Sequence, residues 1–171
     1  MDKKLSDFYE TFLLDTGETK LALNEIDFHN ETLENFDLRD WIFCNVKFNN
    51  MEFVETSFCS GYFFTCTFIN CTFSNCDLYG ANFWNCNFLN THFVNSKMQK
   101  ATFREGAFSE SEFIQNKLSF TGFYHCTFQN LSFGSINDFD NSIILNCEIL
   151  KNDQVIKISD RIDFQKFLEI N

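Results

Sequence analysis

The chain has 171 residues and a net charge of −11, and it contains 25 phenylalanines and no proline. This length is enough for one domain with a buried core, and the acidic balance argues against nonspecific nucleic-acid binding. No apolar run is long enough to suggest a membrane span. Acidic residues interrupt the apolar run that follows Lys3 and Lys4, so no signal peptide is expected. We therefore expect a cytoplasmic protein with reduced cysteines.

A short amphipathic helix is predicted over residues 4–14. Its apolar residues recur at intervals of three and four, which places them on one helical face. They are Leu5, Phe8, Tyr9, Phe12 and Leu13. A tube of β-strands has open ends that expose backbone groups, so this helix is expected to cover the first coil of the repeat that follows.

A five-residue repeat begins at Leu23 and continues without exception to Phe133. Its 23 central positions hold 17 Phe, 5 Leu and 1 Met. A period of five matches neither a helix nor a flat strand, so the chain must turn a corner in each repeat. Two residues before each centre, from residue 56 to residue 126, every residue is small except Asn116. A narrow tube would be filled by one small and one large inward side chain per repeat.

Residues 71–85 read CTFSN, CDLYG and ANFWN. They match the pattern of the pentapeptide-repeat family, which is a small residue, a polar residue, Leu or Phe, and two variable residues. The chain resembles this family over residues 21–135. The resemblance implies an all-β fold, a right-handed quadrilateral β-helix with four pentapeptides in each twenty-residue coil.

Four of the eight cysteines are separated by multiples of five residues, which raises the question of a metal or redox site. They are Cys66, Cys71, Cys76 and Cys86. All four occupy the small inward position, where a free cysteine acts as a compact apolar residue. Metal sites favour close cysteine pairs with further ligands, whereas a spacing of five places the thiols on successive walls. The sequence therefore predicts buried, unmodified thiols, with no metal and no cofactor.

The five-residue register breaks once, because Asp138 stands where an apolar residue is due. One added residue restores the step at Phe139, Ile144 and Ile149. We therefore predict a one-residue bulge near residues 134–138, then three further repeats. The total of about six and a half coils gives a rod of roughly 31 Å at the spacing of β-strands.

The chain is divided into an N-terminal capping helix and linker (1–20), the repeat domain (21–150) and a C-terminal capping segment (151–171). In the first coils the small position holds larger residues, so these coils are expected to be widened or distorted and to contact the helix. The larger residues are Phe36, Trp41, Val46 and Met51. Ser159 is expected to cap a helix that continues to about Glu169 and covers the last coil. The covering residues are Ile162, Phe167, Leu168 and Ile170. The family resemblance implies that two copies of the chain could form a head-to-head homodimer through this C-terminal segment.

Residues twenty positions apart stack on one wall, so each wall can be read from the sequence. One wall carries an outward aromatic stripe formed by Tyr62, Phe64, Trp84, Arg104 and Tyr124. Contiguous exposed apolar surface marks interaction sites, although stacked aromatic residues also stabilise neighbouring strands. This aromatic stripe is the candidate partner-binding surface.

Two other columns are interpreted as structural. A corner column forms an asparagine ladder that Glu110 interrupts, and another wall carries a small basic surface. The ladder comprises Asn30, Asn50, Asn70, Asn90 and Asn130. The basic surface comprises Tyr79, Lys97, Lys100 and Lys117.

No catalytic motif is present, and a filled tube offers no deep pocket, so no enzyme is expected. The leading interpretation is a rigid rod that binds an unidentified protein through the aromatic stripe. The family resemblance supplies an alternative, because some pentapeptide-repeat proteins protect DNA gyrase from quinolones by mimicking DNA. Against that alternative, residues 56–104 carry a net charge of +2, between ends of −8 and −5, and no long loop interrupts the coils. A third hypothesis, neutralisation of a cognate toxin, has no distinguishing residue.

Overall fold

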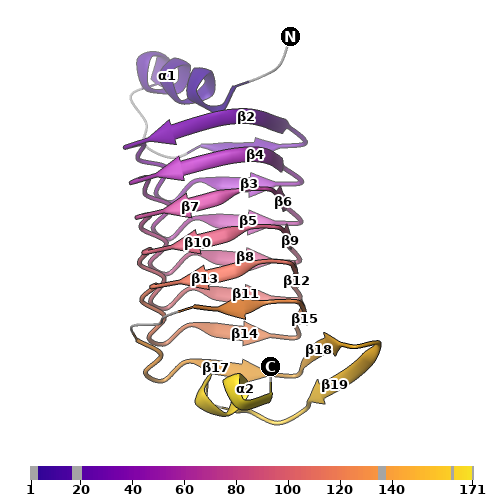
Figure 1. The fold of residues 1–171 in the computed structure, drawn as a ribbon. Coiled ribbons are helices and arrows are strands. Elements are labelled where there is room, and N and C mark those ends of the chain that lie inside the picture. The colour runs from indigo at the N-terminus through magenta and orange to yellow at the C-terminus, as the bar shows by residue number, and fades with distance from the viewer. Residues whose placement is uncertain (1–3, 17–20, 135–137, 163, 171) are drawn as a thin grey trace.

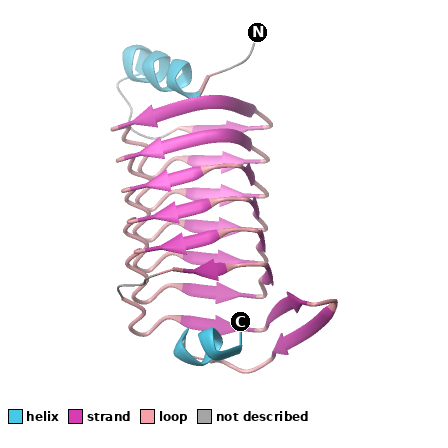
Figure 2. Cartoon of the chain, in the orientation of Figure 1, coloured by secondary structure: helices cyan, strands magenta, loops and turns pink. Residues whose placement is uncertain are grey.

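Strands of the repeat region pair in parallel with strands twenty residues away, so the chain winds into a four-walled β-solenoid (Figure 1). The computed structural model describes residues 4–16, 21–134, 138–162 and 164–170. A helix lies at each end of the rod (Figure 2), and neither is long and apolar enough to cross a bilayer in the described part of the chain. The predicted fold class, a pentapeptide-repeat β-solenoid with helical caps, is confirmed.

The first wall is, within the described residues, a seven-stranded parallel sheet. Its order is β1 (Ala22–Asn24), β3 (Ile42–Cys44), β5 (Tyr62–Phe64), β8 (Asn82–Trp84), β11 (Thr102–Arg104), β14 (Gly122–Tyr124) and β17 (Ile143–Leu145). The fourth wall is held by isolated parallel bridges such as Lys97 with Lys117.

The second and third walls belong to one larger sheet. The second contains β6 (Thr67–Ile69), β9 (Asn87–Leu89), β12 (Ala107–Ser109), β15 (Thr127–Gln129) and β18 (Cys147–Lys151). The third contains β7 (Thr72–Ser74), β10 (His92–Val94), β13 (Glu112–Ile114) and β16 (Ser132–Phe133). The longer strands β2 (Asp27–Glu34) and β4 (Lys47–Val54) continue around the corner between these two walls.

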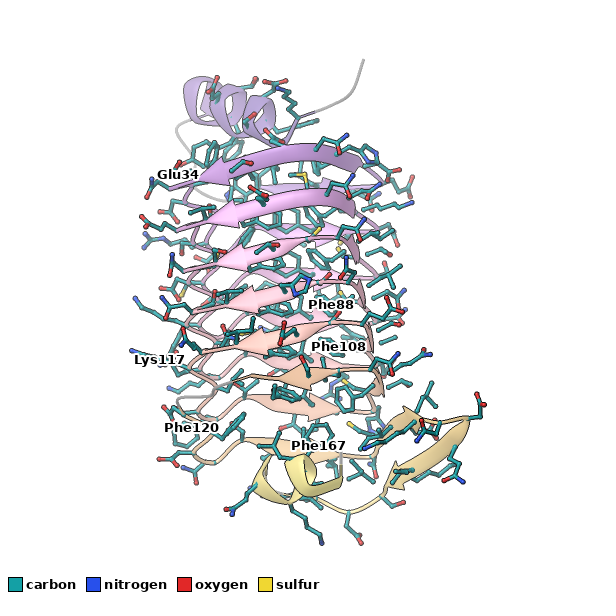
Figure 3. The ribbon with its side chains drawn as sticks, in the orientation of Figure 1. Glu34, Phe88, Phe108, Lys117, Phe120 and Phe167 are labelled. Carbon is teal, nitrogen blue, oxygen red and sulfur yellow. The ribbon has the colours of Figure 1, made fainter. Side chains whose placement is uncertain are left out.

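Phenylalanine rings fill the interior in vertical stacks along three of the four walls, whereas the buried centres of the fourth wall are Leu38, Phe58, Leu78, Met98 and Leu118. Phe83 lies between Phe63 and Phe103, with ring centroids 4.5 and 4.8 Å away and the planes nearly parallel. Phe88 and Phe108, labelled in Figure 3, stack in the same way at 4.6 Å. Rings on adjacent walls meet edge to face. Every central position from residue 23 to residue 128 is buried, so the predicted inward face is confirmed.

The small inward position also makes a hydrogen bond. Where this side chain carries a donor, it donates to the carbonyl of the central residue 23 positions earlier, which belongs to the preceding coil. Thr91 Oγ1 donates to Phe68 O at 3.2 Å, and Cys76 Sγ donates to Phe53 O at 3.3 Å. Asn116, the exception in size, fits because its Nδ2 donates to Phe93 O at 2.7 Å. The position therefore requires a side chain that fits the narrow interior, and Thr, Ser, Cys and Asn at this position add a hydrogen bond between coils.

Asparagine side chains at one corner form the predicted ladder. Asn50 Nδ2 donates to Asn30 Oδ1 at 2.8 Å, Asn70 to Asn50 at 3.0 Å and Asn90 to Asn70 at 2.9 Å. Each of these residues has a positive φ. The ladder thus links adjacent corners in a conformation that asparagine tolerates better than most residues.

The predicted N-terminal helix is α1 (Leu5–Thr16). Phe12 packs on Trp41 with ring centroids 5.7 Å apart, and Tyr9 packs on Phe36 at 4.8 Å, so two of the four large residues, Phe36 and Trp41, meet the helix as expected. The side chain of Leu13 lies outside the described residues. Strand pairing keeps the twenty-residue register even here, so the expected distortion does not extend to the register.

A carboxylate from the solenoid caps α1. The Glu31 side chain accepts hydrogen bonds from the backbone N–H of Leu5 at 2.8 Å and of Ser6 at 3.1 Å, and from the Ser6 hydroxyl. These N–H groups have no partner inside the helix, and negative charge is favourable at this helix end. Glu31 therefore fixes where α1 sits over the first coil.

The predicted shift of one residue is confirmed on both sides of its position. Phe113 pairs with Phe133, twenty residues away. Phe123 pairs with Ile144, twenty-one residues away, and Lys117 with Asp138. The predicted bulge falls largely on residues 135–137, which lie outside the described residues.

The C-terminal prediction needs correction. Residues Gln154–Ile158 form strand β19, antiparallel to β18, and the helix α2 (Phe164–Ile170) begins later than a cap at Ser159 would place it. Asn152 and Asp153 both have positive φ, as a two-residue hairpin turn requires. Beyond β19, an antiparallel bridge between Ile144 and Ile162 keeps the chain extended past Ser159, so the helix begins only afterwards.

Helix α2 nevertheless covers the last coil. Phe167 is fully buried, with its ring 5.3 Å from that of Phe128 (Figure 3), and Ile162 is buried against Ile144. Leu168 was expected to cover the coil as well, but it is 39% exposed because it points away from Phe167's side of the helix. The side chain of Ile170 lies outside the described residues.

The Phe83→Ala variant should lower the free energy of unfolding by about 3–5 kcal/mol, because the deleted ring leaves a cavity between two stacked neighbours. Chemical denaturation followed by circular dichroism measures this loss. A loss below about 1 kcal/mol would mean that the coil collapses around the gap and that the stacks are not tightly packed.

Substitutions at Cys76 separate size from hydrogen bonding. Cys76→Leu should destabilise the protein by about 1–3 kcal/mol through overpacking. Cys76→Ser should cost less, because a hydroxyl can donate to Phe53 O as Ser96 donates to Phe73 O. Thermal melts of the two variants test this, with Cys59→Leu at a half-buried position as the control. Equal melting of Cys76→Leu and the natural protein would contradict a tight interior at this position.

Candidate partner-binding surface

The structure brings the residues of the aromatic stripe together on four consecutive strands of the first wall. Phe64 pairs with Trp84, Trp84 with Arg104, and Arg104 with Tyr124. Tyr62 lies two residues before Phe64 on β5 and faces the same way. Tyr62 is 42% exposed and Trp84 49% exposed, so the stripe presents aromatic surface to solvent.

A shallow groove with a volume of about 210 Å³ lies between the two outward columns of this wall. It is lined by Tyr62, Phe64, Asn82, Phe83, Trp84, Thr102 and Arg104. The Tyr62 and Phe64 rings are nearly parallel at 6.2 Å, and the Phe64 and Trp84 rings are 6.4 Å apart. The groove exists because large residues fill one column, whereas Asn82 and Thr102 in the other are small.

Tyr124 supports the groove and does not line it. A Cβ atom at Gly122 would lie 2.3 Å from the nearest atom of the Tyr124 ring, so the ring folds back over a residue that has no side chain. The Arg104 guanidinium lies 5.6 Å from the centroid of this ring, a distance at which cation–π attraction is significant. Gly122 and Tyr124 together thus form a platform for Arg104.

The Trp84 indole is oriented by an acid at the neighbouring corner. Its Nε1 donates to Glu105 Oε2 at 3.2 Å. This hydrogen bond satisfies the one polar group of the indole and leaves the apolar ring half exposed. The bond fixes how Trp84 faces the groove.

The sequence interpretation missed Phe120, the most exposed large apolar residue of the described chain at 58%. It occupies the corner position before Gly122 with a φ of +60°, and Figure 3 shows it pointing outward, as Lys117 does. At the same corner, one coil earlier, the Lys100 ammonium lies 5.2 Å from the centroid of the Tyr79 ring. The sequence did contain a signal for Phe120, because an aromatic residue stands there at a corner position that polar residues otherwise dominate.

The cysteines are packing residues. Cys66, Cys71, Cys76, Cys86, Cys126 and Cys147 are buried and free, and Cys44 and Cys59 are half-buried. Burial raises the pKa of the Cys71 thiol to about 11 and the pKa of Cys76 to about 12. Within the described residues, no three His, Cys, Asp or Glu side chains come close enough together to hold a metal ion.

Comparison with known protein families also identifies the five-residue repeat. Residues 62–138 match the family described as "Pentapeptide repeat region", whereas no curated protein matches the chain. The solved structure of HetL, a pentapeptide repeat protein involved in heterocyst differentiation regulation from the cyanobacterium Nostoc sp. strain PCC 7120, is similar with a TM-score of 0.60. It is 11% identical, and the match covers 86% of this chain and 72% of HetL.

Two further solved structures are more distant. A pentapeptide repeat protein from the Arabidopsis thaliana thylakoid lumen is 23% identical over 57% of this chain and 64% of its own, with a TM-score of 0.31. QnrB1, a plasmid-mediated fluoroquinolone resistance protein, is 14% identical over 77% and 84%, with a TM-score of 0.28. Scores this low carry no argument about this chain.

The repeat, the walls and the filled interior define a class of protein, a β-solenoid built from five-residue units. Residues 62–138 belong to the pentapeptide-repeat family. At 11% identity the likeness to HetL shows a shared fold alone.

Thiol labelling tests the packing role of the cysteines. At pH 8 a thiol reagent should react quickly with Cys44 and Cys59, and with the six buried thiols only after denaturant is added. Burial blocks access to all six thiols. For Cys71, Cys76, Cys86 and Cys126 burial also raises the pKa, which leaves little thiolate, the reactive form. Partial burial also raises the pKa of Cys44, so its labelling should accelerate as the pH increases. Fast reaction of more than two thiols in the native protein, or a metal bound in stoichiometric amount, would overturn this role.

Proposed function

We propose that the protein is a non-enzymatic, rigid scaffold whose first wall binds a protein partner through the aromatic stripe. The observation that carries the proposal is Trp84, which is half exposed beside an open groove. Its side chain lies 6.4 Å from the tilted Phe64 ring and donates a hydrogen bond to the Glu105 carboxylate. Packing between coils does not account for so much exposed indole, whereas Trp, Tyr and Arg are the residues that dominate binding energy at protein interfaces.

The scaffold favours this role. Each strand that carries the stripe is hydrogen-bonded to strands on both sides, and its central Phe is fixed in the interior stack. Little conformational freedom of the backbone remains to be lost on binding, which is the main benefit of preorganisation.

An acidic DNA mimic that binds gyrase is the second candidate function. It draws on exposed acids near the N-terminal end, such as Glu52 and Glu55, and on the net charge of −11. The two candidate functions require different surfaces. A DNA mimic would use the exposed acids, whereas the groove on the first wall is lined by aromatic residues and Arg104.

Trp84→Ala should weaken binding to a partner identified by pull-down about thirtyfold or more, because truncating a central aromatic anchor costs about 2 kcal/mol. Folding should be nearly unchanged, since the side chain points outward. Leu89→Ala is the matched control, because Leu89 is 42% exposed on the second wall. Titration calorimetry with the purified partner gives the affinities.

The double variant Glu52→Lys with Glu55→Lys should change mainly the salt dependence of binding. If this pair abolishes binding while Trp84→Ala binds normally, the aromatic stripe is not the binding surface and the DNA-mimic hypothesis is favoured.

A further inference from the structure

We propose that the groove on the first wall selects a partner segment in which one aromatic side chain lies beside a carboxylate. The inference rests on the proposed function, because it specifies the ligand chemistry of the same surface. Three observations support it: the size of the groove, the exposed Arg104 guanidinium stacked on Tyr124, and the distribution of charge along the rod.

The groove can hold one ring. Its volume is about 210 Å³, and an apolar cavity of about 150 Å³ is enough for benzene. Tyr62, Phe64 and Trp84 supply aromatic faces and edges around the space, and aromatic pairs gain about 0.5–1.5 kcal/mol beyond the area that they bury. A single inserted ring fits this space better than a flat apolar surface would.

Arg104 provides a carboxylate-binding group at the edge of the same groove. It is exposed and stacked on Tyr124, and it makes no ion pair with any other described residue. The adjacent acid, Glu105, accepts the hydrogen bond from Trp84. The planar guanidinium matches a carboxylate in a two-point hydrogen bond, and stacking on Tyr124 reduces the freedom lost when it forms.

The charge distribution directs an acidic segment to this groove. Lys100, two residues before the groove residue Thr102, is a second cation held on a tyrosine ring. Residues 56–104 have a net charge of +2 in a chain of −11, so an acidic ligand is repelled by both ends and attracted to the middle. A nucleic acid is disfavoured, because a polyanion would extend over the acidic ends.

Trp84 itself reports occupancy. The chain has two tryptophans, and Trp41 is buried under α1 at 1% exposure. The probes are three capped peptides: Gly-Asp-Phe-Asp-Gly, the amide-matched Gly-Asn-Phe-Asn-Gly and the ring-deleted Gly-Asp-Ala-Asp-Gly. The first should shift the Trp84 emission and bind about tenfold tighter than the amide-matched peptide at low salt, the difference expected for one charge-assisted hydrogen bond. It should also bind tighter than the ring-deleted peptide, which lacks the aromatic contacts with the groove.

Arg104→Gln isolates the carboxylate contact. It should weaken Gly-Asp-Phe-Asp-Gly about tenfold and leave the amide-matched peptide unchanged. Arg161→Gln, an exposed site in the C-terminal segment, is the control and should change neither.

Equal binding of the acidic and amide peptides, equal weakening of both by Arg104→Gln, or no emission change at millimolar peptide would each overturn the inference. If these occur while Trp84→Ala still disrupts the protein partner, the proposed binding surface stands without carboxylate selection. If peptide selection is observed but Trp84→Ala does not affect the partner, the proposed function fails and the ligand chemistry of the groove stands.

Discussion

One backbone constraint governs this protein: every fifth residue must adopt a left-handed conformation so that the chain can turn a corner. All 22 corner positions from Glu25 to Asn130 have φ between 48° and 65°. This conformation costs most side chains about 1–2 kcal/mol, and less for Gly and Asn, and Asn fills ten of these positions. Once the corners are fixed, two residues of each five point inward and the outward columns are set. The interior ring stacks and the aromatic stripe are consequences of the same register.

The strict repeat explains why most of the fold could be predicted. Because each repeat has five residues and each coil has twenty, the number of a residue gives its wall and its coil. Counting therefore predicts the buried centres, the stacked columns and the shift near Asp138. The capping contact of Glu31 with Leu5 could not be predicted, because it joins the repeat to a helix that lies outside it, where counting by five gives no position. The C-terminal hairpin was missed because a cap signal at Ser159 was weighed without the turn at Asn152.

The candidate surface, too, could be predicted only in part from the sequence. Counting places Trp84 next to Arg104, but it does not show that the Tyr124 ring folds over Gly122 and carries the guanidinium. That arrangement depends on a side-chain rotamer and on an absent Cβ. The outcome is a groove in which apolar surface and one cation lie together on a backbone held by a continuous sheet. The proposed function uses both features, the apolar surface for binding energy and the cation for selectivity.

Site-specific photocrosslinking tests the central claim, that the first wall is the partner-binding surface, most directly. A photoreactive phenylalanine analogue would be placed at position 84 on the first wall, at 89 on the second wall and at 52 near the acidic end, and each protein irradiated with its partner. The account predicts a covalent adduct from position 84 and none from 89 or 52. Adducts from position 52 with none from 84 would contradict it.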